Sequence, residues 1–143
     1  MPYDELLRTR RIRKETISKT EVSRALARAA RDLRTARHVM AEDWDWGFAI
    51  AYDAVHQVSR AYMFAEGYRP ASKESHKNVF AFMREAMGEE FAELIGYFDR
   101  IRTKRHRAIY DVAGLITETE AKNLFAKAQS FVKLIRGKLG GGE

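Results

Sequence analysis

The stretch WDWGFAIAYDAVHQVSRAYMFAEG (residues 44–67) decides the fold of this 143-residue chain. Its apolar side chains fall on most faces of a helix, which is typical of a helix in the middle of a bundle. Asp43 or Asp45 can cap the helix, which runs from about Trp46 to Glu66, and Gly67 ends it. At 1.5 Å per residue such a helix is about 30 Å long, the diameter of a small domain. We therefore predict a bundle built around this segment.

Amphipathic helices are expected on both sides of this central helix. Ser18 with Glu21, and Thr117 with Glu120, form S/T-x-x-E capping boxes that mark helix starts before apolar stripes. The stripes predict further helices over residues 18–41, 72–88, 89–110 and 117–139. Only 2 prolines interrupt the chain, and no strand pattern occurs. The prediction is an all-α, mostly antiparallel bundle of about five helices.

The expected domain organisation is simple. Residues 1–17 show no sustained period and form a basic N-terminal arm, residues 18–139 form the bundle, and residues 140–143 form a disordered tail. Cysteine is absent, which excludes disulfides, thiolate metal sites and cysteine nucleophiles. No apolar run reaches the roughly 18 residues of a membrane span, and no secretory signal opens the chain. We therefore expect a soluble cytoplasmic protein.

The positive charge is concentrated in two places. The net charge is +6, yet residues 1–14 alone carry +3 and residues 99–107 (DRIRTKRHR) carry +4. The rest of the chain is therefore close to neutral. Two basic clusters on a neutral body indicate a polyanionic partner, because phosphate contacts supply most sequence-independent affinity for nucleic acids. The alternative for each cluster is a solvated helix end.

The second basic cluster has an unusual position on its helix. The apolar stripe that begins at Phe91 continues into Arg102 and Arg105, with His106 one turn from Arg102. A buried unpaired guanidinium is unfavourable, so this face needs a partner. Three alternatives follow: the helix outruns the core, an ion pair forms with a carboxylate such as Asp53, or a cleft binds phosphate through these side chains.

The remaining histidines predict little chemistry. His38 and His56 lie mid-helix and are interpreted as structural or exposed. His76 lies at the start of a helix, where it either faces the same cleft or caps the helix. No H-x-x-x-H or H-E-x-x-H spacing occurs, so we expect no metal site and no cofactor.

Several segments resemble, in order, the patterns of the HEPN domain family. RTKRHRAIYD (residues 102–111) is similar to its signature, and AIAYDA (residues 49–54) is similar to its central-helix pattern. FAEGYRP (residues 64–70), followed by His76 and Lys77, resembles its inter-helix segment. The resemblance covers about residues 20–136. It implies a commonly dimeric helical bundle from prokaryotic toxin–antitoxin or defence systems, often beside a nucleotidyltransferase partner.

The resemblance also implies two kinds of activity. Active HEPN domains are metal-independent ribonucleases whose Arg-x4–6-His motif pairs across a dimer, and members without the motif bind nucleotides, RNA or proteins. Here Arg105 takes the position of the motif arginine, His106 that of the following polar residue, and Tyr110 that of the histidine. Arg100-x5-His106 also meets the spacing, but Arg100 points away from the apolar stripe. A tyrosine, with an ordinary pKa near 10, is a poor proton shuttle at neutral pH.

The leading hypothesis is therefore a homodimeric HEPN domain that binds RNA or a nucleotide. Its expected binding residues are Arg102, Lys104, Arg105, His106, Arg107 and Tyr110. The alternatives are a metal-independent endoribonuclease with Arg105 and His106 as catalytic residues, and a non-catalytic protein that binds a nucleotidyltransferase.

Overall fold

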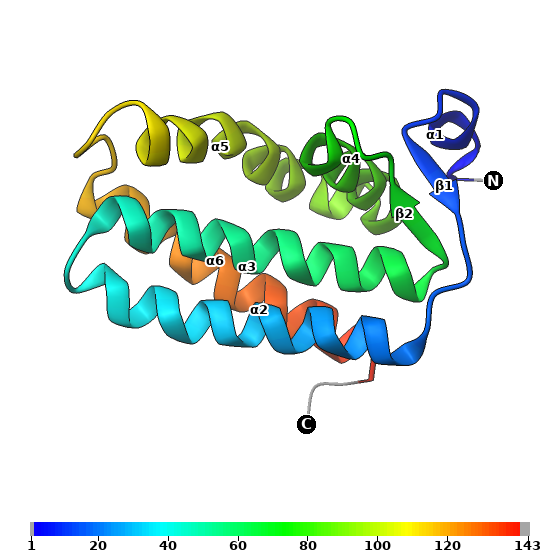
Figure 1. Cartoon of the computed structure of the whole chain (residues 1–143), viewed down its shortest axis with the longest axis horizontal. Coiled ribbons are helices and arrows are strands. Elements are labelled where there is room, and N and C mark those ends of the chain that lie inside the picture. The colour runs from blue at the N-terminus through cyan, green and yellow to red at the C-terminus, as the bar shows by residue number, and fades with distance from the viewer. Residues whose placement is uncertain (1, 141–143) are drawn as a thin grey trace.

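The computed structural model describes residues 2–140 and shows the predicted helical bundle (Figure 1). Its elements are α1 (Asp4–Arg8), β1 (Ile12–Lys14), α2 (Lys19–Met40), α3 (Trp44–Ala65), β2 (Tyr68–Pro70), α4 (Ser75–Met87), the short 3-10 helix η1 (Glu89–Phe91), α5 (Ala92–Tyr110) and α6 (Glu118–Lys138). The five longer helices, α2 to α6, confirm the all-α bundle. None of the helices described is long and apolar enough to cross a membrane. Of the expected disordered tail, residues 141–143 lie outside the described residues.

Helix α3 lies at the centre of the bundle, as predicted. It packs against α2, α4, α5 and α6, and most of its residues are buried, with Phe48, Tyr52 and Val55 at most 1% exposed. Helices α2 and α3 run side by side in opposite directions (Figure 1). Their close approach depends on Gly47, because a Cβ atom there would lie only 3.0 Å from the Met40 Cα atom.

Polar side chains mark the helix ends, and one predicted capping box is only half formed. Thr117 and Glu120 make the complete reciprocal box at the start of α6. At α2, Ser18 Oγ accepts from the Glu21 N–H, but the Glu21 carboxylate binds Arg69 instead of returning to Ser18. The box is incomplete because a cation from another part of the chain competes for the Glu21 carboxylate.

Two neighbouring aspartates have different roles at the start of α3. Asp43 caps the helix by accepting from the Trp46 N–H. Asp45 is buried and instead accepts hydrogen bonds from the N–H groups of Gly114 and Ile116, at 2.6 and 2.9 Å. This carboxylate therefore fixes the turn between α5 and α6 onto the start of α3.

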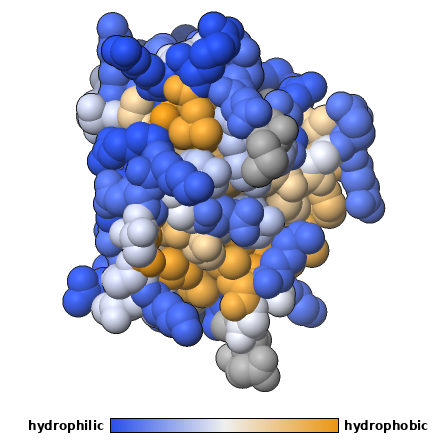
Figure 2. All heavy atoms as spheres, turned by 90° about the vertical axis from the view of Figure 1, so that its right-hand side faces the viewer, coloured by the Kyte–Doolittle hydropathy of each residue, from blue (hydrophilic) through white to orange (hydrophobic). Residues whose placement is uncertain are grey.

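The prediction that the chain has no strand is wrong at two places. Strand β1 pairs antiparallel with β2, with Ile12 opposite Pro70, so part of the expected basic arm is ordered against the bundle. Leu6 and Ile12 are buried in the core. Each strand has only three residues, too few for a period-2 pattern to be visible in the sequence. Figure 2 shows this end of the molecule, where hydrophilic residues cover most of the face and apolar patches interrupt them.

Candidate functional site

Helix α3 carries polar side chains on one face of its otherwise apolar length. Asp53, His56, Gln57 and Arg60 recur at helical spacing, and the last three turns of α3 present them to one cavity. His56 is only 7% exposed. Our sequence interpretation of His56 as structural or exposed missed this site. The spacing of these four polar residues is the signal that could have found it.

The cavity beside this face, which we call the arginine cavity, has a volume of about 570 Å³. Five arginines from five different elements line it: Arg13 of β1, Arg28 of α2, Arg60 of α3, Arg69 of β2 and Arg105 of α5. Asp53 is the one carboxylate among its lining residues. Arginine is the side chain best suited to hold phosphate or carboxylate by paired hydrogen bonds. The lining therefore concentrates guanidinium groups from distant parts of the chain.

A second cavity of about 410 Å³, which we call the histidine cavity, adjoins the first. The two share Ser75, His76 and Arg105 in their linings. The other residues that line the histidine cavity are Tyr52, Glu74, Lys77, Arg102, Thr103 and His106. Arg105 and His76 thus stand where a ligand in one cavity would continue into the other.

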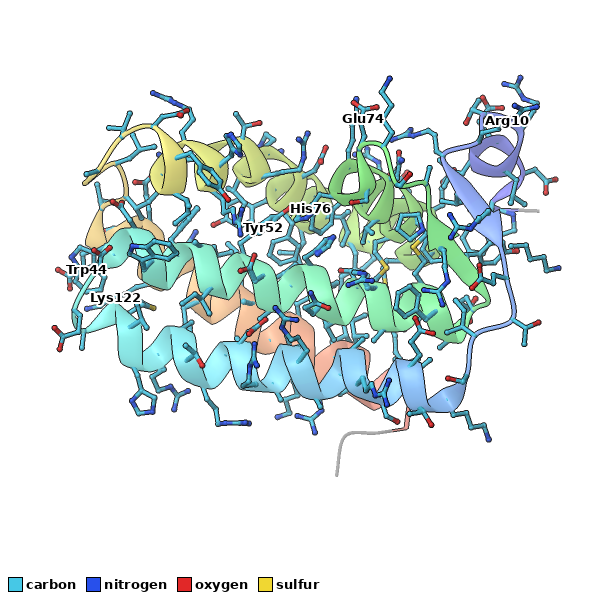
Figure 3. The ribbon with its side chains drawn as sticks, viewed as in Figure 1. Arg10, Trp44, Tyr52, Glu74, His76 and Lys122 are labelled. Atoms are coloured by element: carbon cyan, nitrogen blue, oxygen red, sulfur yellow. The ribbon has the colours of Figure 1, made fainter. Side chains whose placement is uncertain are left out.

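Three aromatic side chains meet between α3 and α4, as the labelled Tyr52 and His76 show in Figure 3. The Tyr52 hydroxyl and His76 Nδ1 share a hydrogen bond of 3.1 Å, and the rings of His56 and His76 stack with centroids 3.7 Å apart. His56 Nε2 is buried and has no hydrogen-bond partner among the described residues. This confirms one predicted alternative for His76, because its ring faces the cleft.

Burial and neighbouring cations keep both imidazoles neutral at physiological pH. Burial lowers the pKa of His56 well below its ordinary value, and the neighbouring His76, Arg60 and Arg105 act in the same direction. Burial also lowers the pKa of His76, helped by Arg105 and Arg102. Burial raises the pKa of Tyr52, so its hydroxyl stays protonated. The hydrogen bond between the Tyr52 hydroxyl and His76 Nδ1 therefore joins two neutral groups.

Arg105 forms the predicted ion pair and also lines both cavities. Its Nη2 atom lies 3.0 Å from Asp53 Oδ1, which confirms the ion pair, and its guanidinium lies over the Tyr52 ring at 5.9 Å. It also lines both cavities, and its Nε atom is buried without a partner among residues 2–140. Burial raises the pKa of Asp53, although Arg105 acts against this shift. The ion pair thus leaves donor capacity on Arg105 unused.

The structure brings some of the expected binding residues together and separates others. Arg102 and His106 line the histidine cavity with Arg105. Lys104 forms an ion pair with a carboxylate of α6 and lies outside both linings. Arg107 and Tyr110 are exposed on the last turn of α5, and neither is among the lining residues. The Tyr110 ring lies 4.7 Å from the His106 ring, and the Tyr110 side chain is 67% exposed.

Arg13, Arg28 and Arg69 are cavity residues that the sequence did not single out. The charge of Arg69 is neutralised, because it forms ion pairs with Glu15 at 2.5 Å and Glu21 at 2.8 Å. Local patterns hold no signal for these three, since they reach the cavity only through the pairing of β1 with β2 and the packing of α2. Among residues 2–140, no cluster of His, Asp or Glu could hold a metal ion.

Comparison with known families places the chain. A family model for the HEPN domain matches residues 22–138. The chain belongs to the HEPN domain family. Neither a search of curated proteins nor one of solved structures found a match. In this HEPN domain, Arg13 lies before the matched region, so the segment ahead of the family domain adds a cation to the cavity.

Proposed function

We propose that this HEPN domain binds RNA or a nucleotide through its phosphates, in the arginine and histidine cavities. The observation that carries the proposal is the lining of the arginine cavity, where five arginines from five elements meet. Asp53 is the one carboxylate in that lining, and Glu15, Glu21 and Asp32 pair with three of the arginines from outside it, so the arginines still outnumber the carboxylates. Arg105 stands between the two cavities, and Arg102 and His106 extend the donor surface into the second. Such an excess of positive charge in a concave site favours binding of a phosphate-bearing ligand.

The wider setting is proposed from the family resemblance. Lys104, Arg107 and Tyr110, on α5, would contact a longer RNA outside the cavities. We propose a cytoplasmic homodimer, as is common in the family. It would act in a prokaryotic toxin–antitoxin or defence system, beside a nucleotidyltransferase partner. A salt-sensitive affinity is expected, because each neutralised phosphate releases condensed counterions.

The test measures binding of labelled single-stranded RNA and of labelled ATP, each at two salt concentrations. Arg105→Ala should weaken binding at least tenfold, because it removes the shared cation of the two cavities. Arg100→Ala is the matched control, since Arg100 is exposed on the same helix and lines neither cavity. Equal losses in both variants, or no binding by the wild-type protein, would overturn the proposal.

A metal-independent ribonuclease is the second candidate. The observation that favours it is the shared lining of His106 and Arg105, since a histidine beside a phosphate-binding arginine can move protons during phosphodiester cleavage. The histidine expected at the end of the motif is replaced by Tyr110, which lies outside the cavity lining. RNA cleavage that survives a chelator and is lost in His106→Ala would establish this activity. Binding without cleavage would dismiss it.

A further inference from the structure

The arrangement of the two cavities points to the part of the ligand that is recognised. We propose that the arginine cavity receives a terminal phosphate, the monoester or polyphosphate end of a nucleotide or of an RNA strand, and that the rest of the ligand leaves through the histidine cavity. This inference rests on the proposed function and narrows it. It distinguishes the end of a phosphate chain from an internal phosphodiester.

The placement of the arginines favours an end group. Residues of β1, α2, α3, β2 and α5 all line the arginine cavity, so cations approach the occupant from several elements at once. A terminal phosphate offers three oxygens that carry no ester bond, whereas an internal phosphodiester offers two and must send its chain out on both sides. A cavity with donors from five elements therefore fits the terminal group better.

Unpaired polar atoms in this lining point to a missing partner. His56, which is 7% exposed, lines the arginine cavity, and its buried Nε2 atom has no partner among residues 2–140. The Arg105 Nε atom is in the same situation. Arg60 donates only to Gln57 Oε1, at 3.3 Å, and makes no ion pair within the described part of the chain. Buried polar groups are normally satisfied, so the unpaired His56 Nε2 and Arg105 Nε–H indicate that a ligand atom reaches them.

The shared wall supplies an exit for the rest of the ligand. Ser75, His76 and Arg105 line both cavities, so a ligand held by its terminal phosphate would pass Arg105 into the histidine cavity. There Arg102 and Lys77 provide cations for a second phosphate, and the exposed ring of His106 provides a flat surface for a base or sugar. Both cavities have volumes in the range of about 300–1,000 Å³ that is usual for small-ligand sites.

The charge of the arginine cavity agrees with a terminal phosphate. Arg13 and Arg69 share their charges with Glu15 and Glu21, and Arg105 shares its charge with Asp53. The cations of Arg28 and Arg60 remain the least compensated, because Arg28 reaches Asp32 only at 3.8 Å. Two such cations suit a phosphomonoester, which carries a charge of about −1.5 to −2 at neutral pH.

The experiment compares ligands that differ only at their ends. An RNA of one sequence, labelled at its 3′ end, is prepared with a 5′-hydroxyl or a 5′-monophosphate, and its mirror set is labelled at the 5′ end with a 3′-hydroxyl or 3′-phosphate. Adenosine, AMP and ATP are measured as competitors, which separates free nucleotides from RNA ends. We expect at least tenfold tighter binding for one phosphorylated end, or for AMP and ATP over adenosine.

Two variants test whether the preference for a phosphorylated ligand arises in the arginine cavity. Arg60→Gln should abolish the preference for the phosphorylated ligand, and Arg84→Gln is the control, since Arg84 is exposed on α4 and lines neither cavity. Circular dichroism checks that Arg60→Gln is folded, and the comparison of ligand ends on the wild-type protein needs no variant.

The possible outcomes distinguish failure of the terminal-phosphate inference from failure of the proposed RNA or nucleotide binding. If phosphorylated and unphosphorylated ends bind within twofold of each other, and Arg105→Ala still weakens both, the terminal-phosphate inference is overturned and the proposed function stands. If no RNA and no nucleotide binds, both fall together. A preference that survives in Arg60→Gln would place the end group elsewhere and would also overturn the inference.

Discussion

Removing the single carboxylate of the arginine cavity should strengthen its affinity for anions. Asp53 forms the ion pair with Arg105, and its charge would repel any phosphate held by the same guanidinium. Asp53→Asn keeps the size and shape of the side chain and removes the charge. We therefore expect the variant to bind RNA or ATP more tightly than the wild-type protein does.

The size of the effect follows from the geometry. Arg105 Nη2 lies 3.0 Å from Asp53 Oδ1, and a phosphate oxygen on the other side of the guanidinium would lie about twice as far from that carboxylate. Two unit charges about 6 Å apart, at an effective dielectric constant of about 40, repel by ~1.4 kcal/mol, which is roughly tenfold in affinity. Salt screens part of this, so about three- to tenfold tighter binding is expected at physiological ionic strength.

The same substitution should leave the stability almost unchanged at neutral pH. Burial raises the pKa of Asp53, so the ionised form is disfavoured in the folded protein, and its cost appears as the pH rises through that pKa. Asp53→Asn removes the cost of burying the charge but also removes the ion pair with Arg105. That pair is partly exposed, and such pairs contribute at most about 1 kcal/mol. The two effects oppose each other.

Fluorescence titration of labelled RNA measures the affinity, and a thermal melt of the same preparation measures the stability. Asp43→Asn is the control for net charge, because Asn can still cap α3 and position 43 lines neither cavity. If Asp53→Asn weakens binding as much as Arg105→Ala does, then Asp53 serves to position the arginine, and the reasoning from repulsion is refuted.

Three further outcomes are expected. Burial holds the pKa of His56 far below its ordinary value, so below about pH 6.5 the unfolded chain takes up a proton that the folded protein does not. The stability of the folded protein should therefore fall as the pH drops. Thermal melts of His56→Phe over the same pH range should show a weaker fall. Gly47→Ala would place a Cβ atom against Met40 and should lower the free energy of unfolding in urea by about 1–3 kcal/mol, whereas an unchanged midpoint would contradict the close helix crossing. Asp45→Ala leaves two N–H groups of the 114–116 turn without their acceptor, which should cost about 1–3 kcal/mol and speed hydrogen exchange there; protection equal to wild type would count against this role.

The helices and part of the site could be predicted because their signals are local. Capping residues such as Ser18 and Thr117 act within one turn, and the apolar periodicity identified α3 as the central helix. The same counting placed Arg102 and Arg105 on the inward face of α5, where the structure has both of them lining a cavity. Side chains three and four residues apart share a face whatever the rest of the chain does.

The sequence by itself determined that the chain forms a helical bundle with basic side chains on an inward face, since helix propensity, capping and periodicity are properties of neighbouring residues. Only the tertiary structure decided that Arg13 and Arg69 meet, through the β1–β2 pairing, and that His56 stacks on His76. It also decided that Arg105 pairs with Asp53 while facing two cavities. A cavity exists where separate elements leave space between them, and that space depends on contacts between residues far apart in the chain, which no local pattern encodes.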